Sequence, residues 1–79
     1  MLALGDIAAA RLFYERAATL GSARAATSLG KTYDPAFLAS IQAAGVTPNR
    51  ELAAQWYRKA VALGDQDAGR WLEKLLPGR

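Results

Sequence analysis

The sequence predicts an all-α fold of two helix–turn–helix repeats with a short extra helix between them. Strand signals are nearly absent, because no stretch alternates apolar and polar residues for long and few residues are β-branched. Alanine, the best helix former, is abundant. Residues 10–31 also align with residues 53–74, and eight of the 22 aligned positions are identical. An internal period of this size indicates a stacked array, in which each unit buries a face against its neighbour.

The first repeat, about residues 6–33, is predicted as two helices joined by a tight turn. Asp6 is placed to cap the first helix and Ser22 the second, since a short side-chain acceptor satisfies first-turn amides. Gly21 can adopt the left-handed conformation that ends the first helix. Residues 1–5 are expected to be the tail of a preceding helix. The apolar stripes of the two helices fall at Ala10, Phe13, Tyr14, Ala17, Ala18 and Leu20, and at Ala25, Leu29 and Tyr33.

An inserted segment, residues 34–48, follows the first repeat and is predicted as a short helix and a loop. Asp34 and Pro35 suit the N-cap and the first helical position, where the missing proline amide costs nothing. About two helical turns follow. Their shared apolar face carries Phe37, Leu38 and Ile41, and the loop is closed by Gly45, Thr47 and Pro48.

The second repeat, about residues 49–76, has the same kinds of helix-starting and helix-ending residues as the first. Asn49 and Asp65 are placed as N-caps, Gly64 ends the first helix, and Pro77 with Gly78 stops the second. The apolar positions recur at i, i+3, i+4 and i+7. They are Ala53, Trp56, Tyr57, Ala60, Val61 and Leu63 in one helix, and Ala68, Leu72 and Leu75 in the other.

Composition excludes several kinds of chemistry. The 79 residues include no cysteine and no histidine, so the chain has no disulfide and lacks the commonest zinc ligands. Without a histidine base, the serines cannot form a hydrolase triad. Asp65 and Asp67 are two residues apart and do not face each other on a helix, so helix capping explains them. We therefore expect no enzyme activity and no catalytic, cofactor-binding or metal site.

The charge pattern indicates an ordinary solvated surface. The formal net charge is +3, and the basic residues are spread along the chain without the clustering that nucleic-acid binding requires. No apolar run approaches the roughly 18–20 residues that span a bilayer. The N-terminus lacks the basic start of a secretory signal. The compartment stays open, with the cytoplasm favoured.

The segment from Ala25 to Thr32 matches a loose P-loop pattern that ends in Gly-Lys-Thr. A P-loop follows a strand and wraps glycine-rich backbone around phosphates. Here no strand precedes the segment, and its residues favour a helix. The internal repeat also aligns it with helical sequence near Leu72, so we interpret it as a helix rather than a nucleotide site.

The aromatic residues are predicted to pack between helices, because they recur at helical spacing and at equivalent positions of the two copies. They are Phe13, Tyr14, Trp56, Tyr57 and Trp71. Trp71 is the exception, since Ser28 occupies the equivalent position of the first copy. It is expected to cover the end of the array or to lie in an interface. If a partner is acidic, the predicted polar contacts are Arg11, Arg24, Arg50, Arg58 and Arg70.

With these residues in view, the chain resembles the Sel1-like repeat family, a branch of the tetratricopeptide (TPR) class of α-solenoids. The strongest match is GVTPNRELAAQWYRKAVALGDQDAGRWL, from Gly45 to Leu72, and the first copy matches from Ala10 to Tyr33. The period of 43 residues is longer than the family's repeat of about 36. The excess lies between Tyr33 and Gly45.

This resemblance implies a non-catalytic protein–protein interaction scaffold that binds a protein or peptide partner in a helical-repeat groove. The alternative is a structural cap at the end of a larger repeat protein. About three repeats are normally needed for a stable array, so two copies suggest the C-terminal part of a longer bacterial repeat protein, or a homodimer. The partner-binding residues themselves are left undetermined by the sequence.

Overall fold

The computed structural model describes residues 4–43 and 45–76, and within them it contains five α-helices and no strand. The helices are α1 (Leu4–Thr19), α2 (Ala23–Tyr33), α3 (Pro35–Ser40), α4 (Arg50–Ala62) and α5 (Asp67–Leu75). The predicted all-α class is therefore confirmed, and so are two helical pairs with a short helix between them.

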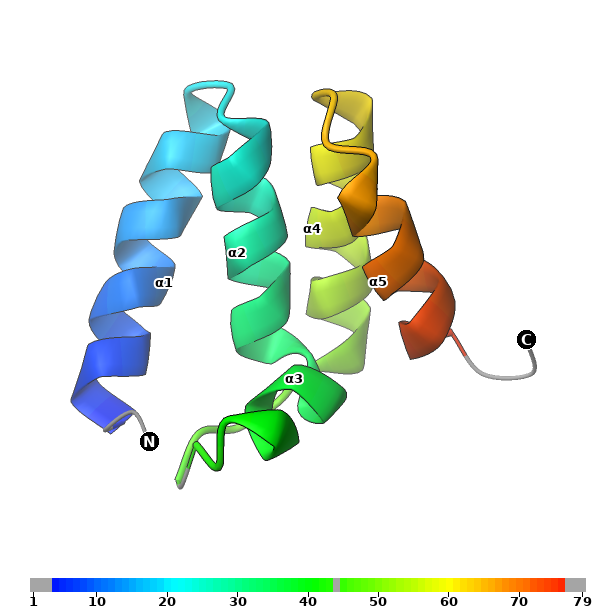
Figure 1. Cartoon of the computed structure of the whole chain (residues 1–79). Helices are drawn as coiled ribbons and strands as arrows, with labels where there is room; N and C mark the ends of the chain where they lie inside the picture. The colour runs from blue at the N-terminus through cyan, green and yellow to red at the C-terminus, as the bar shows by residue number, and fades with distance from the viewer. Residues whose placement is uncertain (1–3, 44, 77–79) are drawn as a thin grey trace.

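The four longer helices stand side by side in chain order (Figure 1). Helix α2 packs against both α1 and α4, and α4 packs in turn against α5. Helix α3 crosses one end of this row and packs on α2. The molecule measures 33 × 30 × 17 Å, so it is a slab rather than a sphere.

The predicted turns and three of the predicted caps are confirmed. Gly21 and Gly64 have φ of 105° and 114°, which a side chain would disfavour. The Ser22 hydroxyl accepts a hydrogen bond from the amide of Ala25 at 3.1 Å. The Asp34 and Asn49 side chains make the equivalent bonds at the starts of α3 and α4. Local chemistry alone therefore sets most of the helix boundaries.

Two predicted caps are wrong. Asp6 lies inside α1, which already includes Leu4, so residues 4 and 5 belong to this helix and not to a preceding one. Helix α5 begins at Asp67 rather than just after Asp65. One Asp65 oxygen accepts from the Asp67 amide at 3.1 Å, and the other accepts from the Thr27 hydroxyl at 2.6 Å. The bond to α2 diverts Asp65 from a simple cap. Pro77 and Gly78 lie outside the described residues.

The core is made of alanines around one large ring. Ala26, Ala53, Ala60 and Ala68 have no exposed surface, and neither has Tyr57. Small side chains let the helix axes approach closely, so that a single ring fills the space between them. No buried side-chain nitrogen or oxygen within residues 4–43 and 45–76 lacks a hydrogen-bond partner.

The inserted segment leaves and rejoins the helical row at one point. The amide of Asn49 donates to the carbonyl of Tyr33 at 2.8 Å, which joins the end of α2 to the start of α4. Between these residues, α3 spans six residues, fewer than the two turns expected. Its apolar face holds as predicted, because Leu38 is buried and Phe37 is half-buried.

Candidate functional site

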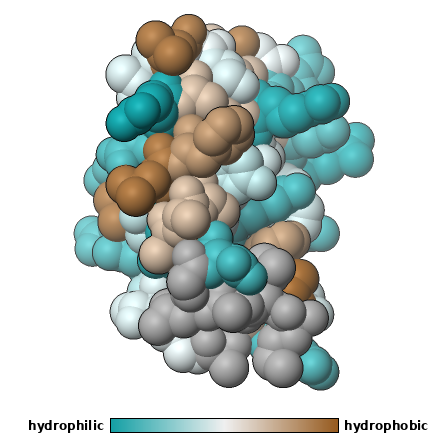
Figure 2. Space-filling view, turned by 90° about the vertical axis from the view of Figure 1, so that its left-hand side faces the viewer, coloured by the Kyte–Doolittle hydropathy of each residue, from teal (hydrophilic) through white to brown (hydrophobic). Residues whose placement is uncertain are grey.

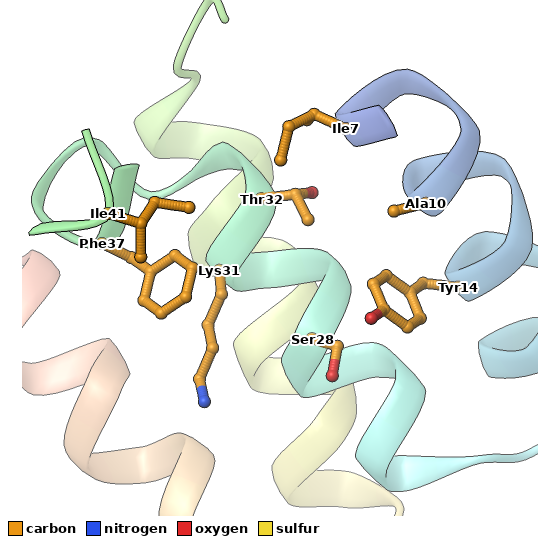
Figure 3. Close-up of a pocket in the computed structure, with 8 residues that line it drawn as sticks. All are labelled: Ile7, Ala10, Tyr14, Ser28, Lys31, Thr32, Phe37 and Ile41. Atoms are coloured by element: carbon orange, nitrogen blue, oxygen red, sulfur yellow. The ribbon is translucent and has the colours of Figure 1, made fainter. Parts of the chain in front are cut away.

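A groove of about 430 Å³ lies over α2, between α1 on one side and α3 on the other (Figure 3). Its size falls within the range of ligand sites. Apolar side chains form its two walls, and α2 provides polar groups between them. The lining residues are Ile7, Ala10 and Tyr14 from α1, Ser28, Lys31 and Thr32 from α2, and Phe37 and Ile41 from the inserted segment.

Two hydroxyl groups of the groove are available to a ligand. Neither the Tyr14 hydroxyl nor the Ser28 hydroxyl makes a hydrogen bond within the described residues, whereas the Thr32 hydroxyl donates to the carbonyl of Leu29 at 2.7 Å. Lys31 is the one charged residue of the lining. The groove therefore offers an apolar cleft, two neutral hydrogen-bonding groups and one cation.

The inserted helix and Trp71 contact each other. The Phe37 ring meets the Trp71 ring edge to face, with centroids 6.0 Å apart at 81°. On its other side, Trp71 stacks on Tyr57 at 6.5 Å and 28°. The two features that the repeat leaves unexplained, the insertion and the extra tryptophan, thus form one cluster. Trp71 is half-buried and packs against the core, and its expected place at the end of an array or in an interface stays a prediction.

Two lysines lie over the Trp71 ring. The Lys31 ammonium is 4.6 Å from the ring centroid and the Lys74 ammonium is 5.5 Å away. Lys31 is also 5.6 Å from the Phe37 centroid. A cation over an aromatic face is attracted by the ring quadrupole. Lys31 therefore links the groove to the aromatic cluster.

The Tyr57 hydroxyl donates a hydrogen bond of 2.8 Å to the buried carboxylate of Asp34. Burial and this bond raise the pKa of the Tyr57 phenol above its usual value. The other Asp34 oxygen accepts from the first amides of α3. One carboxylate thus joins α4 to the inserted helix, and this structural role accounts for the pair.

The P-loop-like segment is part of α2, so its backbone amides bond within the helix and cannot cradle a phosphate. Close packing between helices explains why a glycine occupies position 30. A Cβ atom at this position would lie 2.5 Å from the Tyr57 ring. The glycine that completes the motif is therefore the contact point between α2 and α4.

Two of the five predicted arginine contacts are engaged within the chain. The Arg11 guanidinium donates to the carbonyls of Thr32 and Thr47 and lies 4.0 Å from the centroid of the Tyr33 ring. Arg50 donates to the carbonyl of Leu75 at 3.0 Å. Both arginines therefore tie a first helix to the end of its partner helix. The other three members of the set, Arg24, Arg58 and Arg70, are exposed.

The outer face of α1 is apolar and open. Leu12, Phe13 and Leu20 are 71%, 70% and 83% exposed. Figure 2 looks onto this side of the molecule and shows apolar side chains gathered on it. The prediction that Phe13 packs between helices is therefore wrong. Its equivalent in the second copy, Trp56, is half-buried because α4 packs closely against helices on two sides, whereas the main helix contact of α1 is with α2.

The outer face of α5 is polar. Arg70 and Glu73 are exposed, and their equivalents in α2, Thr27 and Gly30, are buried. Gly30 lies against Tyr57 of α4, and Thr27 bonds to Asp65 in the turn that follows α4. The same helical face therefore receives another helix in the first copy and meets solvent in the second.

Comparisons with protein-family models, curated proteins and solved structures found no match. Within the described residues, no group of histidine, cysteine or acidic side chains could hold a metal ion. In the same part of the chain, every helix is too short or too polar to cross a bilayer. Two surface features of the described residues are candidates for binding, the groove over α2 and the open apolar face of α1.

The sequence alone did not reveal the groove. Lys31 was noted only as part of the P-loop-like segment, and nothing in the sequence marked Ile7 as a lining residue. The sequence did contain one usable signal. Ser28 occupies the position that Trp71 occupies in the second copy, and a small side chain in place of a large one leaves space in the first copy. One of the two walls, however, comes from the inserted segment, which no repeat alignment could place.

Proposed function

We propose that this protein is a non-catalytic scaffold that holds a segment of a partner protein in the groove over α2. We also propose that its two helical pairs stack as a Sel1-like, TPR-class α-solenoid. The equivalent placement of α1 with α2 and of α4 with α5 supports this, and so does the position of α2 between α1 and α4. Stacked helical pairs create extended binding surfaces of this kind.

The observation that carries the proposal is the composition of the groove. It is formed by three separate elements and its walls are apolar. Its polar groups include one amine and two hydroxyls, those of Tyr14 and Ser28, that make no hydrogen bond within the described residues. Such a site can hold a side chain and orient it through a few hydrogen bonds. It offers no acid and base placed together, which general acid–base chemistry requires.

Selection of random displayed peptides on the intact chain tests this function. We expect the selected peptides to bind the wild-type chain and to lose at least tenfold in affinity with Ile41→Arg, which places a charge in the groove. Ala62→Arg, on the exposed surface of α4, is the matched control and should bind normally. Equal binding to both variants would place the peptide site elsewhere.

A terminal structural cap is the second candidate, because the outer face of α5 is polar where the same face of α2 is buried. A cap of this kind stops further stacking. The variant carrying Arg70→Thr and Glu73→Gly would give α5 the facing residues of α2. We expect it to form head-to-tail oligomers with the open face of α1, since a heterologous contact does not close on itself. Sedimentation as a monomer at high concentration would count against the cap.

A further inference from the structure

We infer that the groove receives an aromatic side chain, with tryptophan preferred, from an acidic segment of the partner. This inference deepens the proposed function and depends on it. The molecule itself shows the expected arrangement, because the second copy fills the equivalent space with its own tryptophan.

Three pairs of equivalent residues define the correspondence between the copies. They are Tyr14 with Tyr57, Ser28 with Trp71, and Lys31 with Lys74. In the second copy the indole of Trp71 stacks on the tyrosine and lies beneath the ammonium of Lys74. In the first copy the tyrosine and the lysine are retained, and a serine replaces the indole.

The groove is the space that this replacement leaves. Tyr14, Ser28 and Lys31 all line it, and Figure 3 shows that Phe37 lies across α2 from Tyr14. An indole placed over Ser28 would stack on Tyr14, as Trp71 stacks on Tyr57. Phe37 lines the groove while its ring edge contacts Trp71, so it belongs to both sites.

The polar groups suit an indole better than an aliphatic side chain. A buried indole N–H needs an acceptor, and both the Ser28 and the Tyr14 oxygens are free of other hydrogen bonds within the described residues. Lys31 makes no ion pair in the same part of the chain, and the lining contains no acidic residue. A cation without a carboxylate partner favours a ring face and a negatively charged flank.

Three short peptides test the inference by NMR titration of the isotope-labelled intact chain. The probes are acetyl-Glu-Trp-Glu-amide and its analogues with leucine or alanine at the centre. We expect the tryptophan peptide to shift the amides around Ser28 and to bind about fivefold more tightly than the leucine peptide, in keeping with the extra attraction of an aromatic pair. The alanine peptide should give no saturable shift.

Ser28→Trp supplies the occupant from within the chain. We expect this variant to melt at a higher temperature than wild type and to lose binding of the tryptophan peptide. Gln55→Trp, which adds the same side chain on the exposed surface of α4, should bind like wild type. If Ser28→Trp does not fold, Ser28→Leu serves as a smaller block and should weaken binding at least fivefold.

The charge component has its own variant. Lys31→Gln should weaken binding of the peptide with glutamate flanks and leave a peptide with glutamine flanks unchanged. Circular dichroism would first establish that this variant keeps its fold, since Lys31 also lies over Trp71.

Several outcomes would overturn the inference. Equal or tighter binding of the leucine peptide would leave the groove as a peptide site and remove its aromatic preference. If no peptide shifts the amides around Ser28 while displayed peptides still bind there, the occupant is not an aromatic side chain. A wild-type dimer that Ser28→Trp dissociates would identify the occupant as the exposed Phe13 of a second copy, and not a partner segment.

Discussion

The two copies place the same tyrosine in opposite circumstances. Tyr57 is fully buried between α2 and α5, and its hydroxyl bonds to Asp34. Tyr14 is half-buried, lines a groove, and has no hydrogen bond for its hydroxyl within the described residues. The sequence around both is similar, with eight of 22 aligned positions identical. The comparison teaches that the neighbours of a repeated residue decide whether it stabilises the fold or remains available to a ligand.

The largest expected effect concerns the contact that buries Tyr57. Gly30→Ala would place a methyl group against the Tyr57 ring and should lower the free energy of unfolding by about 3 kcal/mol, because this ring is fully buried and closely packed. The equivalent change in the second copy, Glu73→Ala, lies on an exposed face and should stay within about 0.5 kcal/mol of wild type. Urea unfolding followed by circular dichroism measures both. Similar losses in the two variants would contradict the conclusion that this face is packed in α2 and exposed in α5.

Trp71→Ser makes the second copy resemble the first. The variant loses the ring contacts with Tyr57 and Phe37, and its free energy of unfolding should be about 2 kcal/mol lower than that of wild type. The loss stays moderate because Trp71 is only half-buried. Trp71→Phe, which keeps a ring, should recover about half of that loss. An unchanged unfolding midpoint for Trp71→Ser would show that the cluster does not hold α5 and the insertion together.

Tyr57→Phe sharpens the comparison of the two hydroxyls. It should cost about 1.5 kcal/mol at neutral pH, because one oxygen of the buried Asp34 loses its donor. Tyr14→Phe, which removes an unpaired hydroxyl, should change stability by less than about 0.5 kcal/mol. Denaturant titrations of the two variants, compared with wild type, provide the measurement. Equal costs would contradict the assigned roles.

Wild type and Tyr57→Phe should also differ in how their stability depends on high pH. The raised pKa of Tyr57 means that the folded chain keeps a proton that the unfolded chain releases above about pH 10. The contribution of Tyr57 is therefore complete below pH 10 and is lost as the pH rises above it. Stability measured from pH 8 to pH 11 should fall more steeply for wild type than for Tyr57→Phe. Parallel curves would show that Tyr57 does not titrate with unfolding.

The smallest effect on stability is expected at the open face of α1. Leu20→Gln should change the free energy of unfolding by less than about 0.5 kcal/mol, because Leu20 is 83% exposed. It should nevertheless reduce binding of a hydrophobic dye and any self-association, since exposed apolar patches mark contact surfaces. Leu29→Gln, at a buried position, is the contrasting change and should prevent folding.

Local rules predicted the helices well because their signals lie within a few residues. The caps at Ser22 and Asn49 depend on short side chains next to first-turn amides, and no distant partner competes for them. The predicted cap at Asp65 failed because a residue of α2 takes one of its oxygens. The predicted burial of Phe13 failed for a related reason, since α4 packs closely against helices on two sides, whereas the main helix contact of α1 is with α2.

The groove was harder to predict from the sequence than the helices were. The difference between Ser28 and Trp71 marked a position where the copies diverge, and the insertion marked another. That the two differences meet depends on how α3 crosses the helical row, and Phe37 carries no signal of its own that points to Trp71. Long-range packing of this kind needs the structure.

The hydrogen bond between Asn49 and Tyr33 has a consequence for how this chain could vary. Because the ends of the inserted segment are joined directly, the spacing between α2 and α4 does not depend on what lies between them. Asp34 is fixed by its bond to Tyr57, but residues 35–48 form a side branch on the helical row. Such a branch can lengthen, shorten or change its contacts while the row keeps its register. A lineage could alter the ligand preference of the groove by rewriting this branch alone.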